Sequence, residues 1–175
     1  ATAYSNWTKL SQASLATDPQ YSRYAVTFVE NHDTQWRSAT EQQDPIKSDT
    51  LAANAYILAM PGTPCVFMKH WIDWNPKDKN MNPLRNLVGI SNTSSFKCNE
   101  SGVTYYSFTS TGTNGNLYAV VGTKANTVTP DKSVWALAAE GKNYRYFIER
   151  SKETAWTSLP SGTYYGNTTA TLRAI

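Results

Sequence analysis

The hydrophobic pattern of the chain changes near residue 92. Before that point, apolar runs alternate with segments of helical spacing. The run Tyr24–Val29 is almost continuously apolar or β-branched, which is typical of a strand buried on both faces of a parallel sheet. A helix is predicted to begin near Ser48 and Asp49, because Ser is a good N-cap and Asp suits the first turn. Pro61 and Gly62 should end this helix.

An apolar stripe runs along the predicted helix, and a second strand and helix follow it. The stripe consists of residues at helical spacing: Leu51, Ala52, Ala55, Leu58 and Ala59. Cys65–Met68 predicts a second short buried strand, and Asn82 and Pro83 predict a helix with Asn as cap and Pro at its first position. The apolar face of that helix consists of Leu84, Leu87 and Val88. This order is the repeating unit of an α/β barrel or a doubly wound sheet.

After residue 92, helical spacing gives way to short strand-like runs separated by turn sequences. The runs are Val103–Phe108, Leu117–Val121, Val134–Ala138 and Tyr144–Ile148, and the turns are Thr113–Asn116, Glu140–Asn143 and Ser161–Gly162. This spacing predicts an all-antiparallel β-sandwich. We therefore expect two domains, residues 1–91 and residues 92–175. The segment 1–20 is either the end of a preceding helix or an irregular lead-in, with apolar residues at Trp7, Leu10 and Leu15.

Composition narrows the classes of function. The net charge is +3 and the charged fraction is 17%, which is low for a nucleic-acid binder, and the Lys and Arg residues are scattered. No apolar stretch approaches the roughly 20 residues that cross a bilayer. Six Trp and eleven Tyr suit stacking on sugar rings, although β-rich secreted proteins often share this composition. The chain opens on Ala1 without a signal-peptide pattern or initiator Met, which suggests a processed or excised piece.

The two cysteines do not form a disulfide framework. Cys65 lies in an apolar run and is expected to be a buried small hydrophobe, whereas Cys98 lies in a polar stretch. The alternative is a single disulfide bond between Cys65 and Cys98. No Cys/His spacing suits zinc, so no metal site is predicted in this chain.

Three polar residues at the end of the first predicted strand are the candidates for chemistry: Asn31, His32 and Asp33. In barrels of alternating strands and helices, residues just past the C-terminal end of a strand reach the mouth of the active site. An isolated His–Asp pair in a loop can equally be a local cap or a solvated turn. The neighbouring motifs decide whether these residues belong to an active site or to a simple turn.

Three further segments combine with Phe28–Thr34 to make a recognisable set: Tyr56–Phe67, His70–Trp71 and Asp73–Trp74. Together they closely resemble the C-terminal part of α-amylases, a family of retaining glycoside hydrolases. The resemblance implies a partial (β/α)8 barrel, with strands seven and eight and their helices over about residues 20–91. The antiparallel sandwich called domain C would follow, although it fits by position rather than by motif.

The resemblance implies roles for the residues that match the family motif. Asp33 matches the carboxylate that stabilises the transition state, and His32 matches the histidine that binds the sugar at the cleavage point. An additional carboxylate can favour an oxocarbenium-like ring, and an imidazole can donate to a hydroxyl where charge develops. Asn31, Trp36 and Trp71 are further candidates for substrate binding. Trp71 and its neighbour Trp74 could equally seal the loop against the barrel.

We call the three residues Asn31, His32 and Asp33 the tip. Other residues near the tip are expected to support it. Glu30 directly precedes Asn31, and the residue at its position in the family is commonly acidic without a role in proton transfer. Lys69 and His70 follow the second predicted strand, where packing or a supporting hydrogen bond is a more natural role than substrate contact. Trp135 and Trp156 lie in the predicted sandwich, where a core role is the default.

What the chain lacks limits what it can do alone. The resemblance places the nucleophile Asp and the general-acid Glu on strands four and five, outside this chain, so the chain alone should not hydrolyse starch. No cofactor is expected in the chain, and calcium is possible in the full-length enzyme. The expected partners are an α-glucan and either the rest of the barrel or a second copy, without nucleic acid or membrane. The expected location is secreted, cell-surface or periplasmic, and the alternative is a non-catalytic starch-binding or structural module.

Overall fold

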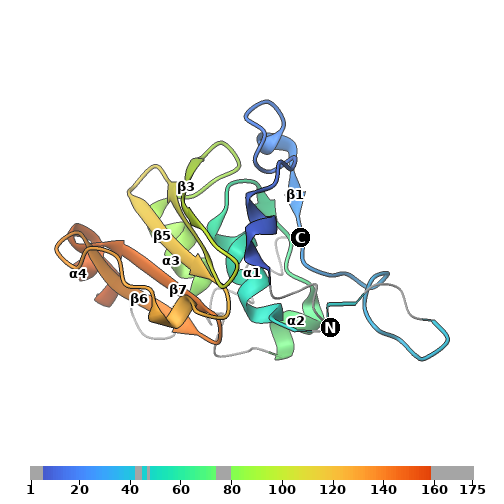
Figure 1. Ribbon diagram of the computed structural model, residues 1–175. Helices are drawn as coiled ribbons and strands as arrows, with labels where there is room; N and C mark the ends of the chain where they lie inside the picture. Colours follow the sequence, from blue (N-terminus) through green and yellow to red (C-terminus); the bar gives the residue numbers. More distant parts are fainter. Residues whose placement is uncertain (1–5, 42–44, 47, 74–79, 159–175) are drawn as a thin grey trace.

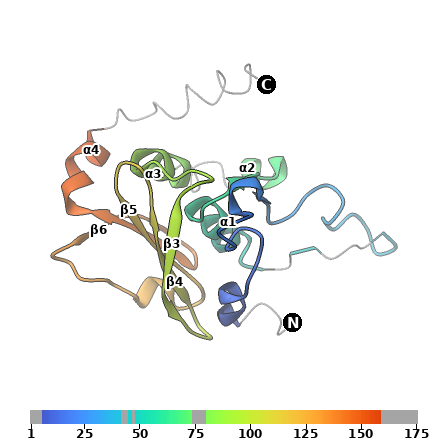
Figure 2. The same ribbon diagram turned by 90° about the horizontal axis from the view of Figure 1, so that it is seen from above.

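The structure is a computed structural model that describes residues 6–41, 45–46, 48–73 and 80–158. It consists of a five-stranded antiparallel sheet, a group of helices on one side of that sheet, and a short parallel strand pair farther out (Figure 1). A long segment after the first strand, residues 31–41, runs away from the sheet (Figures 1 and 2). The candidate site lies on this outer side.

The first strand and the first helix form the expected strand–helix–strand unit. Strand β1 (Val26–Thr27) pairs in parallel with β2 (Thr63–Pro64), and helix α1 (Thr50–Ala59) connects them. The predicted helix is thus confirmed, including its end before Pro61 and Gly62. Its predicted cap is wrong: the N-cap is Asp49 rather than Ser48, and the Asp49 side chain makes no capping hydrogen bond. Gly62 takes a left-handed φ of 101°, a conformation that favours glycine.

Strand β1 is much shorter and more exposed than the sequence predicts. Only two of the residues in Tyr24–Val29 are in the strand, and the prediction of burial on both faces is wrong for the described chain. Val26 is 64% exposed and Phe28 is 51% exposed. The physical reason is that a doubly buried strand needs neighbours on both sides, and β2 is the one strand paired with β1 among the described residues.

The second predicted strand is displaced by two residues. Cys65–Met68 is not a strand: β2 ends at Pro64, and helix α2 (Met68–Asp73) begins at Met68. The Cys65 N–H donates to the Thr27 carbonyl at 2.7 Å. The pairing of the two strands goes no further, because β1 ends at Thr27. Cys65 is therefore exposed rather than buried, and both it and Cys98 are free thiols.

Helix α3 (Met81–Val88) anchors the end of α1. Its N-cap is Asn80, so Pro83 is the third residue of the helix rather than the first. Arg85 reaches from α3 to the C-terminal end of α1, where its guanidinium donates to the carbonyls of Leu58 at 2.8 Å and Met60 at 2.6 Å. A third bond runs to the Gly62 carbonyl at 2.8 Å. The bond to Leu58 satisfies a carbonyl that the helix end leaves without a partner, and the other two satisfy carbonyls of the turn that follows the helix.

The second half of the described chain forms one antiparallel sheet with the order β3-β4-β5-β7-β6. Its strands are β3 (Ser95–Ser101), β4 (Tyr106–Thr111), β5 (Asn116–Val121), β6 (Trp135–Gly141) and β7 (Tyr144–Glu149). Four of the five match predicted runs within a few residues. Strand β3 was not predicted. The five strands described between residues 95 and 149 belong to one sheet, so the two-sheet sandwich stays a prediction. The turn at Ser161–Gly162 lies outside the described residues.

Short helical turns complete the described chain. The 3-10 turns are η1 (Trp7–Ser11), η2 (Ser22–Tyr24), η3 (Ala125–Thr127) and η4 (Arg150–Lys152), and the last helix is α4 (Glu153–Thr157). Trp7 is buried, and its N–H donates to the Val103 carbonyl at 3.1 Å, whereas Leu15 is 67% exposed. The start of the chain is therefore an irregular segment with one anchored turn.

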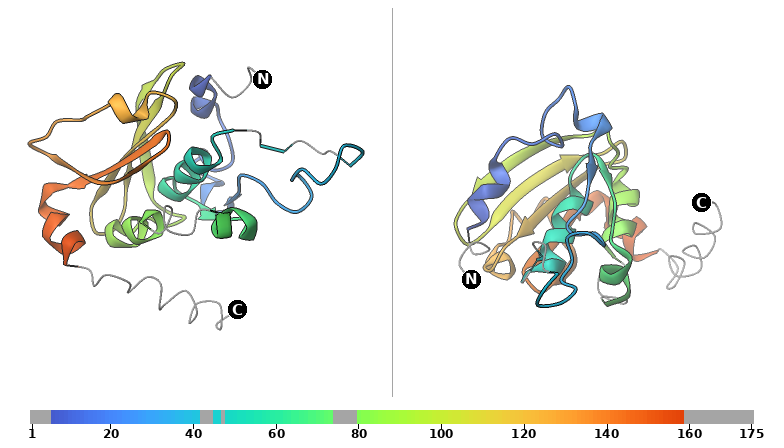
Figure 3. Two further views of the ribbon diagram at one scale, coloured as in Figure 1. Left: turned by 90° about the horizontal axis from the view of Figure 1, so that it is seen from below. Right: turned by 90° about the vertical axis from the view of Figure 1, so that its right-hand side faces the viewer.

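One hydrophobic core joins the two halves of the chain. Helices α1 and α3 lie against the sheet (Figure 3), and the core contains Leu58 and Leu84 from the helices together with Phe108 and Ile148 from the strands. Aromatic rings fill much of the contact, such as the edge-on pair of Tyr56 and Phe108 at 5.5 Å between ring centroids. The division into domains at residues 91 and 92 stays a prediction, and the core crosses it.

Trp135 and Trp156 lie at the margins of the packed regions. Trp135 packs against the smaller cluster of Val120, Ala125 and Phe147, and Trp156 packs against the main core while remaining partly exposed. The expected core role is therefore confirmed in part: both side chains pack against a hydrophobic cluster, but neither is fully buried.

Candidate functional site

The tip after β1 is a turn organised by Asn31. The Asn31 side-chain oxygen accepts the N–H of Asp33 at 2.9 Å and the N–H of Thr34 at 3.0 Å. In return the Thr34 hydroxyl accepts the Asn31 N–H at 3.0 Å. A side-chain amide that accepts backbone N–H groups two and three residues on is a common way to fix a turn. Asn31 therefore builds the turn that presents the two residues after it.

His32 and Asp33 are presented to solvent by this turn. Their side chains are 78% and 69% exposed, and the His32 Nε2 atom lies 3.4 Å from the Asp33 Oδ1 atom. Arg37 lies on the other side of the carboxylate, with its Nη2 atom also 3.4 Å from Asp33 Oδ1. The same guanidinium donates to the His32 carbonyl at 2.7 Å. A carboxylate between an imidazole and a guanidinium suits contact with a polar, hydroxyl-rich ligand.

Arg37 is a residue that the sequence reasoning missed. It follows Asp33 by four positions in a segment without regular structure, so no helical periodicity links the two. The local signal was a basic residue close to the candidate carboxylate. In the structure Arg37 holds both the Asp33 side chain and the backbone of His32.

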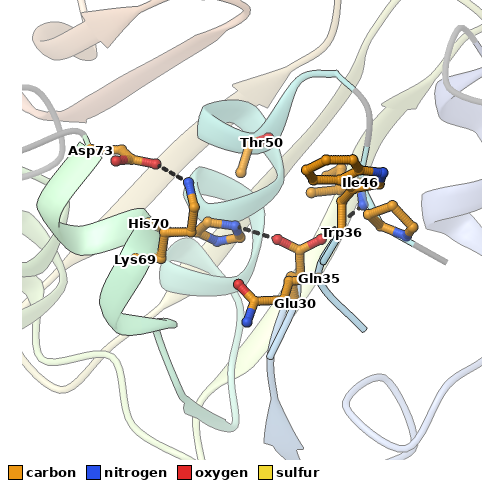
Figure 4. Close-up of a pocket in the computed structure, with 9 residues that line it drawn as sticks. Glu30, Gln35, Trp36, Ile46, Thr50, Lys69, His70 and Asp73 are labelled. Atoms are coloured by element: carbon orange, nitrogen blue, oxygen red, sulfur yellow. Dashed lines mark hydrogen bonds and ion pairs between the residues drawn. The ribbon is translucent and has the colours of Figure 1, made fainter. Parts of the chain in front are cut away.

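A pocket of about 260 Å³ lies beside the tip (Figure 4). Its described lining comes from the segment after β1, the N-terminal end of α1 and the helix α2, and it includes Glu30, Trp36, Ile46, Lys69, His70 and Asp73. Trp36 is 60% exposed and belongs to this wall. The residues Asn31, His32 and Asp33 do not line this pocket.

The structure thus brings some of the predicted substrate-binding residues together and separates others. Trp36 shares the pocket wall with Glu30 and His70. Trp71, which is half-buried on α2, is outside the described lining. Trp74 lies outside the described residues. The assignments of Asp33, His32, Asn31, Trp36 and Trp71 stay predictions.

Glu30 and His70 form a buried pair at the base of the pocket. They are 7% and 4% exposed, and the Glu30 Oε2 atom lies 2.9 Å from the His70 Nε2 atom (Figure 4). The other carboxylate oxygen accepts the Ile46 N–H at 3.0 Å. The predicted supporting roles of Glu30 and His70 agree with this geometry.

An ion pair lies at the outer rim of the pocket. The Lys69 ammonium donates to the Asp73 carboxylate at 2.8 Å, one helical turn apart on α2. The hydrogen bond to Asp73, together with its charge, raises the pKa of Lys69 above its ordinary value. Both side chains are at least half exposed, so solvent screens the pair and its contribution to stability is small.

In residues 6–41, 45–46, 48–73 and 80–158, no three His, Cys, Asp or Glu side chains come together in a way that could hold a metal ion. Among the helices of the same ranges, none has the length and apolar character required to span a membrane.

Comparisons with known proteins show that the sequence is similar to α-amylases and to glucan 1,4-α-maltotetraohydrolases. Over 85 residues it is 40% identical to the α-amylase type B isozyme of Hordeum vulgare, a match covering 47% of this chain and 54% of that protein. Over 94 residues it is 35% identical to the glucan 1,4-α-maltotetraohydrolase of Roseateles saccharophilus, covering 51% of this chain and 16% of the relative. A 51-residue stretch is 47% identical to the probable α-amylase 2 of Arabidopsis thaliana.

These matches confirm the resemblance to α-amylases that the motifs indicate. No protein-family profile matches the chain. The chain spans about half the length of the Hordeum vulgare protein and a smaller share of the other relatives. It is therefore similar to one part of these enzymes.

Proposed function

We propose that the chain is the C-terminal part of a secreted α-amylase that hydrolyses α-1,4-glucosidic bonds of starch-like glucans with retention. The observation that carries this proposal is the position of Asp33: an exposed carboxylate in the turn that follows β1, six residues past the C-terminal end of this strand of a parallel pair, within a sequence similar to α-amylases. The C-terminal ends of such strands are where barrel enzymes build their active sites.

In the proposed reaction, Asp33 stabilises the transition state instead of attacking the sugar. A retaining glycosidase forms a glycosyl-enzyme intermediate through two other carboxyl groups, a nucleophile and an acid, about 5 Å apart. Positive charge develops on the sugar ring as the leaving group departs, and the Asp33 carboxylate would favour that charge. His32 would donate to a sugar hydroxyl beside it, and Arg37 would keep the carboxylate and the His32 backbone in place.

The pocket between the segment that follows β1 and helix α2 would hold part of the glucan chain. Trp36 offers an aromatic face at its wall, and sugar rings stack on such faces through their C–H groups. No step of this mechanism uses calcium, which stays a prediction about the full-length enzyme. Without the nucleophile and the acid, this chain alone would not hydrolyse starch.

The proposal is tested in the enzyme encoded by the full reading frame. Asp33→Asn should remove nearly all of kcat while leaving the fold intact. A His32 substitution should cost less, because it deletes one hydrogen bond worth about 1–3 kcal/mol to a charged or developing-charge partner. The matched control is Asp131→Asn, which changes an exposed carboxylate in the turn before β6 and should leave turnover on maltooligosaccharides unchanged. A near-normal rate for Asp33→Asn would overturn the assignment.

The chain would need a partner to cover β1. An apolar groove of about 320 Å³ runs along this strand, with Leu15, Val26, Phe28 and Ile57 among its walls. Exposed apolar edges invite pairing with another chain, so the groove would take the rest of the barrel in the whole enzyme or a second copy of the fragment alone. Light scattering on the isolated chain tests this, and a stable monomer at high concentration would contradict it.

The alternative is a non-catalytic starch-binding or structural module. Its support is the antiparallel sheet, which makes up much of the described chain. A binding module would not need the tip beside the parallel strand pair. The reading frame upstream of Ala1 separates the two proposals: an enzyme requires the missing strands with their carboxylates, and a module does not.

A further inference from the structure

The buried Glu30–His70 pair has no part in the chemistry proposed above, and its position calls for a separate explanation. Its residues are 40 positions apart in the sequence, one at the end of the β1 segment and the other in α2. Ionisable side chains are rarely buried unless they are paired and hydrogen-bonded. Here both side chains are buried and paired to each other.

The Glu30 carboxylate joins three separate segments. One oxygen lies 2.9 Å from the His70 ring on α2, and the other accepts the N–H of Ile46 at 3.0 Å. Ile46 comes after residues 31–41 in the sequence and before α1. The carboxylate therefore ties Ile46 and the residues after β1 to helix α2.

A further contact extends the pair into α1. The Nδ1 atom of His70 lies 3.4 Å from the Asn54 side-chain nitrogen, and that nitrogen donates to the Thr50 carbonyl at 2.9 Å. Asn54 is itself fully buried. The imidazole is thus held on the helix side as well as on the carboxylate side, which limits the positions that Glu30 can take.

The tip has its own internal bonds, but these do not fix its direction. Asn31 closes the turn through the N–H groups of Asp33 and Thr34, and it could keep that shape in any orientation. Glu30 is the residue directly before Asn31. Its anchored side chain therefore determines where the finished turn points.

The geometry points to the Glu30–His70 pair as a positioning device for the tip residues His32 and Asp33. This inference rests on the proposed function of Asp33 and adds to it: the pair touches no reacting atom and acts through the direction of the turn. A misplacement of about 1 Å at a reacting group can cost on the order of 100-fold in rate. A buried anchor next to the turn reduces such misplacement.

The first test measures the anchor itself in this chain. Glu30→Ala should accelerate hydrogen exchange at the Ile46 amide by about tenfold or more, because the amide loses its acceptor. The amides of Asp33 and Thr34 should keep their protection, since Asn31 still accepts from them. Glu30→Gln retains an oxygen that can accept from Ile46, so it should restore most of the protection.

The matched control is Glu149, another carboxylate that accepts a backbone N–H. Its Oε2 atom accepts the Asn116 N–H at 3.1 Å, and its Oε1 atom accepts the Asn116 side-chain N–H at 2.9 Å. Glu149→Ala should accelerate exchange at the Asn116 amide and leave that of Ile46 unchanged. A general loss of stability would instead accelerate both amides in both variants.

The two histidines of the chain provide a spectroscopic readout. Side-chain ¹⁵N resonances of His70 should shift in Glu30→Gln, because a neutral amide replaces the carboxylate beside Nε2. The His32 resonances report whether the tip has changed its surroundings: they should shift in Glu30→Ala and stay near their original positions in Glu149→Ala.

The last test is kinetic and uses the full-length enzyme. Glu30→Ala and His70→Ala should each lower kcat by about 10- to 100-fold with a smaller change in KM, whereas Glu149→Ala should leave both near their original values. If Asp33→Asn abolishes turnover but Glu30→Ala leaves kcat and the Ile46 amide unchanged, the positioning role is wrong and the proposed function stands. If Asp33→Asn retains a normal rate, the proposed function itself fails.

Discussion

The Tyr146 hydroxyl of β7 donates a hydrogen bond to the Ala55 carbonyl in the middle of α1. The two residues are 91 positions apart and lie on opposite sides of the expected domain boundary. Tyr146 is completely buried, and burial raises the pKa of its phenol well above the ordinary value. The phenol therefore stays protonated as a donor, and it joins the sheet to the helix that connects β1 and β2.

Tyr146→Phe should lower the free energy of unfolding by about 1–2 kcal/mol, the usual loss for one buried hydrogen bond. The ring contacts with Tyr144 at 5.5 Å between centroids should persist in this variant. Tyr21→Phe removes the same hydroxyl from a side chain that is 52% exposed and should change stability by less than about 0.5 kcal/mol. Urea unfolding of both variants decides the matter, and equal losses would show that the bond to Ala55 adds no stability.

Local signals in the sequence explain which elements could be predicted. Helix α1 is predictable because polar residues precede its start at Thr50 and because Pro61 and Gly62 follow its end at Ala59. The missed strand Ser95–Ser101 has mostly exposed side chains, because it lies at the edge of the sheet. Its sequence therefore lacks the alternation of apolar and polar residues that identifies a strand.

Long-range contacts explain what the sequence could not show about the site. Asp33 and His32 were found through a contiguous motif. The contact between Glu30 and His70 spans 40 positions and leaves no periodic pattern. The length of β1 was misjudged for a related reason: the apolar residues Val26 and Phe28 indicate neighbours that the described chain does not contain.

Arg85 is predicted to be one of the most sensitive positions in the chain. It is 7% exposed and donates to three carbonyls at the end of α1. Arg85→Met should cost about 3–5 kcal/mol, because several hydrogen bonds from a charged group are lost and the carbonyls remain buried. Arg85→Lys keeps the charge but not the planar fork, so it should recover only part of the loss.

The control for Arg85 is Arg150, whose side chain is 49% exposed in an ion pair with Glu153. Arg150→Met should cost less than about 1 kcal/mol, as is usual for surface pairs. Thermal unfolding of the three variants under identical conditions provides the comparison. A small loss for Arg85→Met would show that water replaces the guanidinium at these carbonyls.

The turn between β4 and β5 approaches the end of α3 too closely for a side chain at Gly112. A Cβ atom on Gly112 would overlap the Val88 carbonyl oxygen and the backbone of Gly89. Since backbone atoms cannot move aside as a flexible side chain can, Gly112→Ala should destabilise the chain by about 1–3 kcal/mol, as overpacking does. It should also weaken the Asn114 N–H bond to the Val88 carbonyl, which is 3.0 Å long.

Gly102→Ala is the matched comparison for Gly112→Ala. Its Cβ would lie 3.3 Å from the Tyr105 carbonyl oxygen, a distance that a small shift relieves. We expect Gly102→Ala to change stability by less than about 1 kcal/mol. Exchange at the Asn114 amide, followed together with the free energy of unfolding, shows whether the larger effect of Gly112→Ala arises at α3. Equal effects of the two substitutions would contradict the proposed clash.

Alkaline pH should destabilise the chain in part through Tyr56. Burial, mainly, and to a smaller extent the charge of the nearby Cys98 thiolate raise the pKa of Tyr56 from 10.0 to about 12. Below pH 10 the phenol is protonated in both the folded and the unfolded chain, so it contributes no pH dependence. Between about pH 10 and 12 the unfolded chain loses this proton while the folded chain keeps it, and stability therefore falls as pH rises.

Two pKa units correspond to about 2.7 kcal/mol, so this is the order of the loss that Tyr56 adds over that interval. Tyr56→Phe removes the titrating group along with a 3.4 Å hydrogen bond to the Leu10 carbonyl. The variant should therefore start slightly less stable at pH 7 and then lose stability less steeply between about pH 10 and 12. Urea unfolding at a series of pH values gives the two curves. Parallel curves would mean that the Tyr56 phenol titrates alike in the folded and the unfolded chain, because only a difference in proton binding between the two states makes their slopes differ.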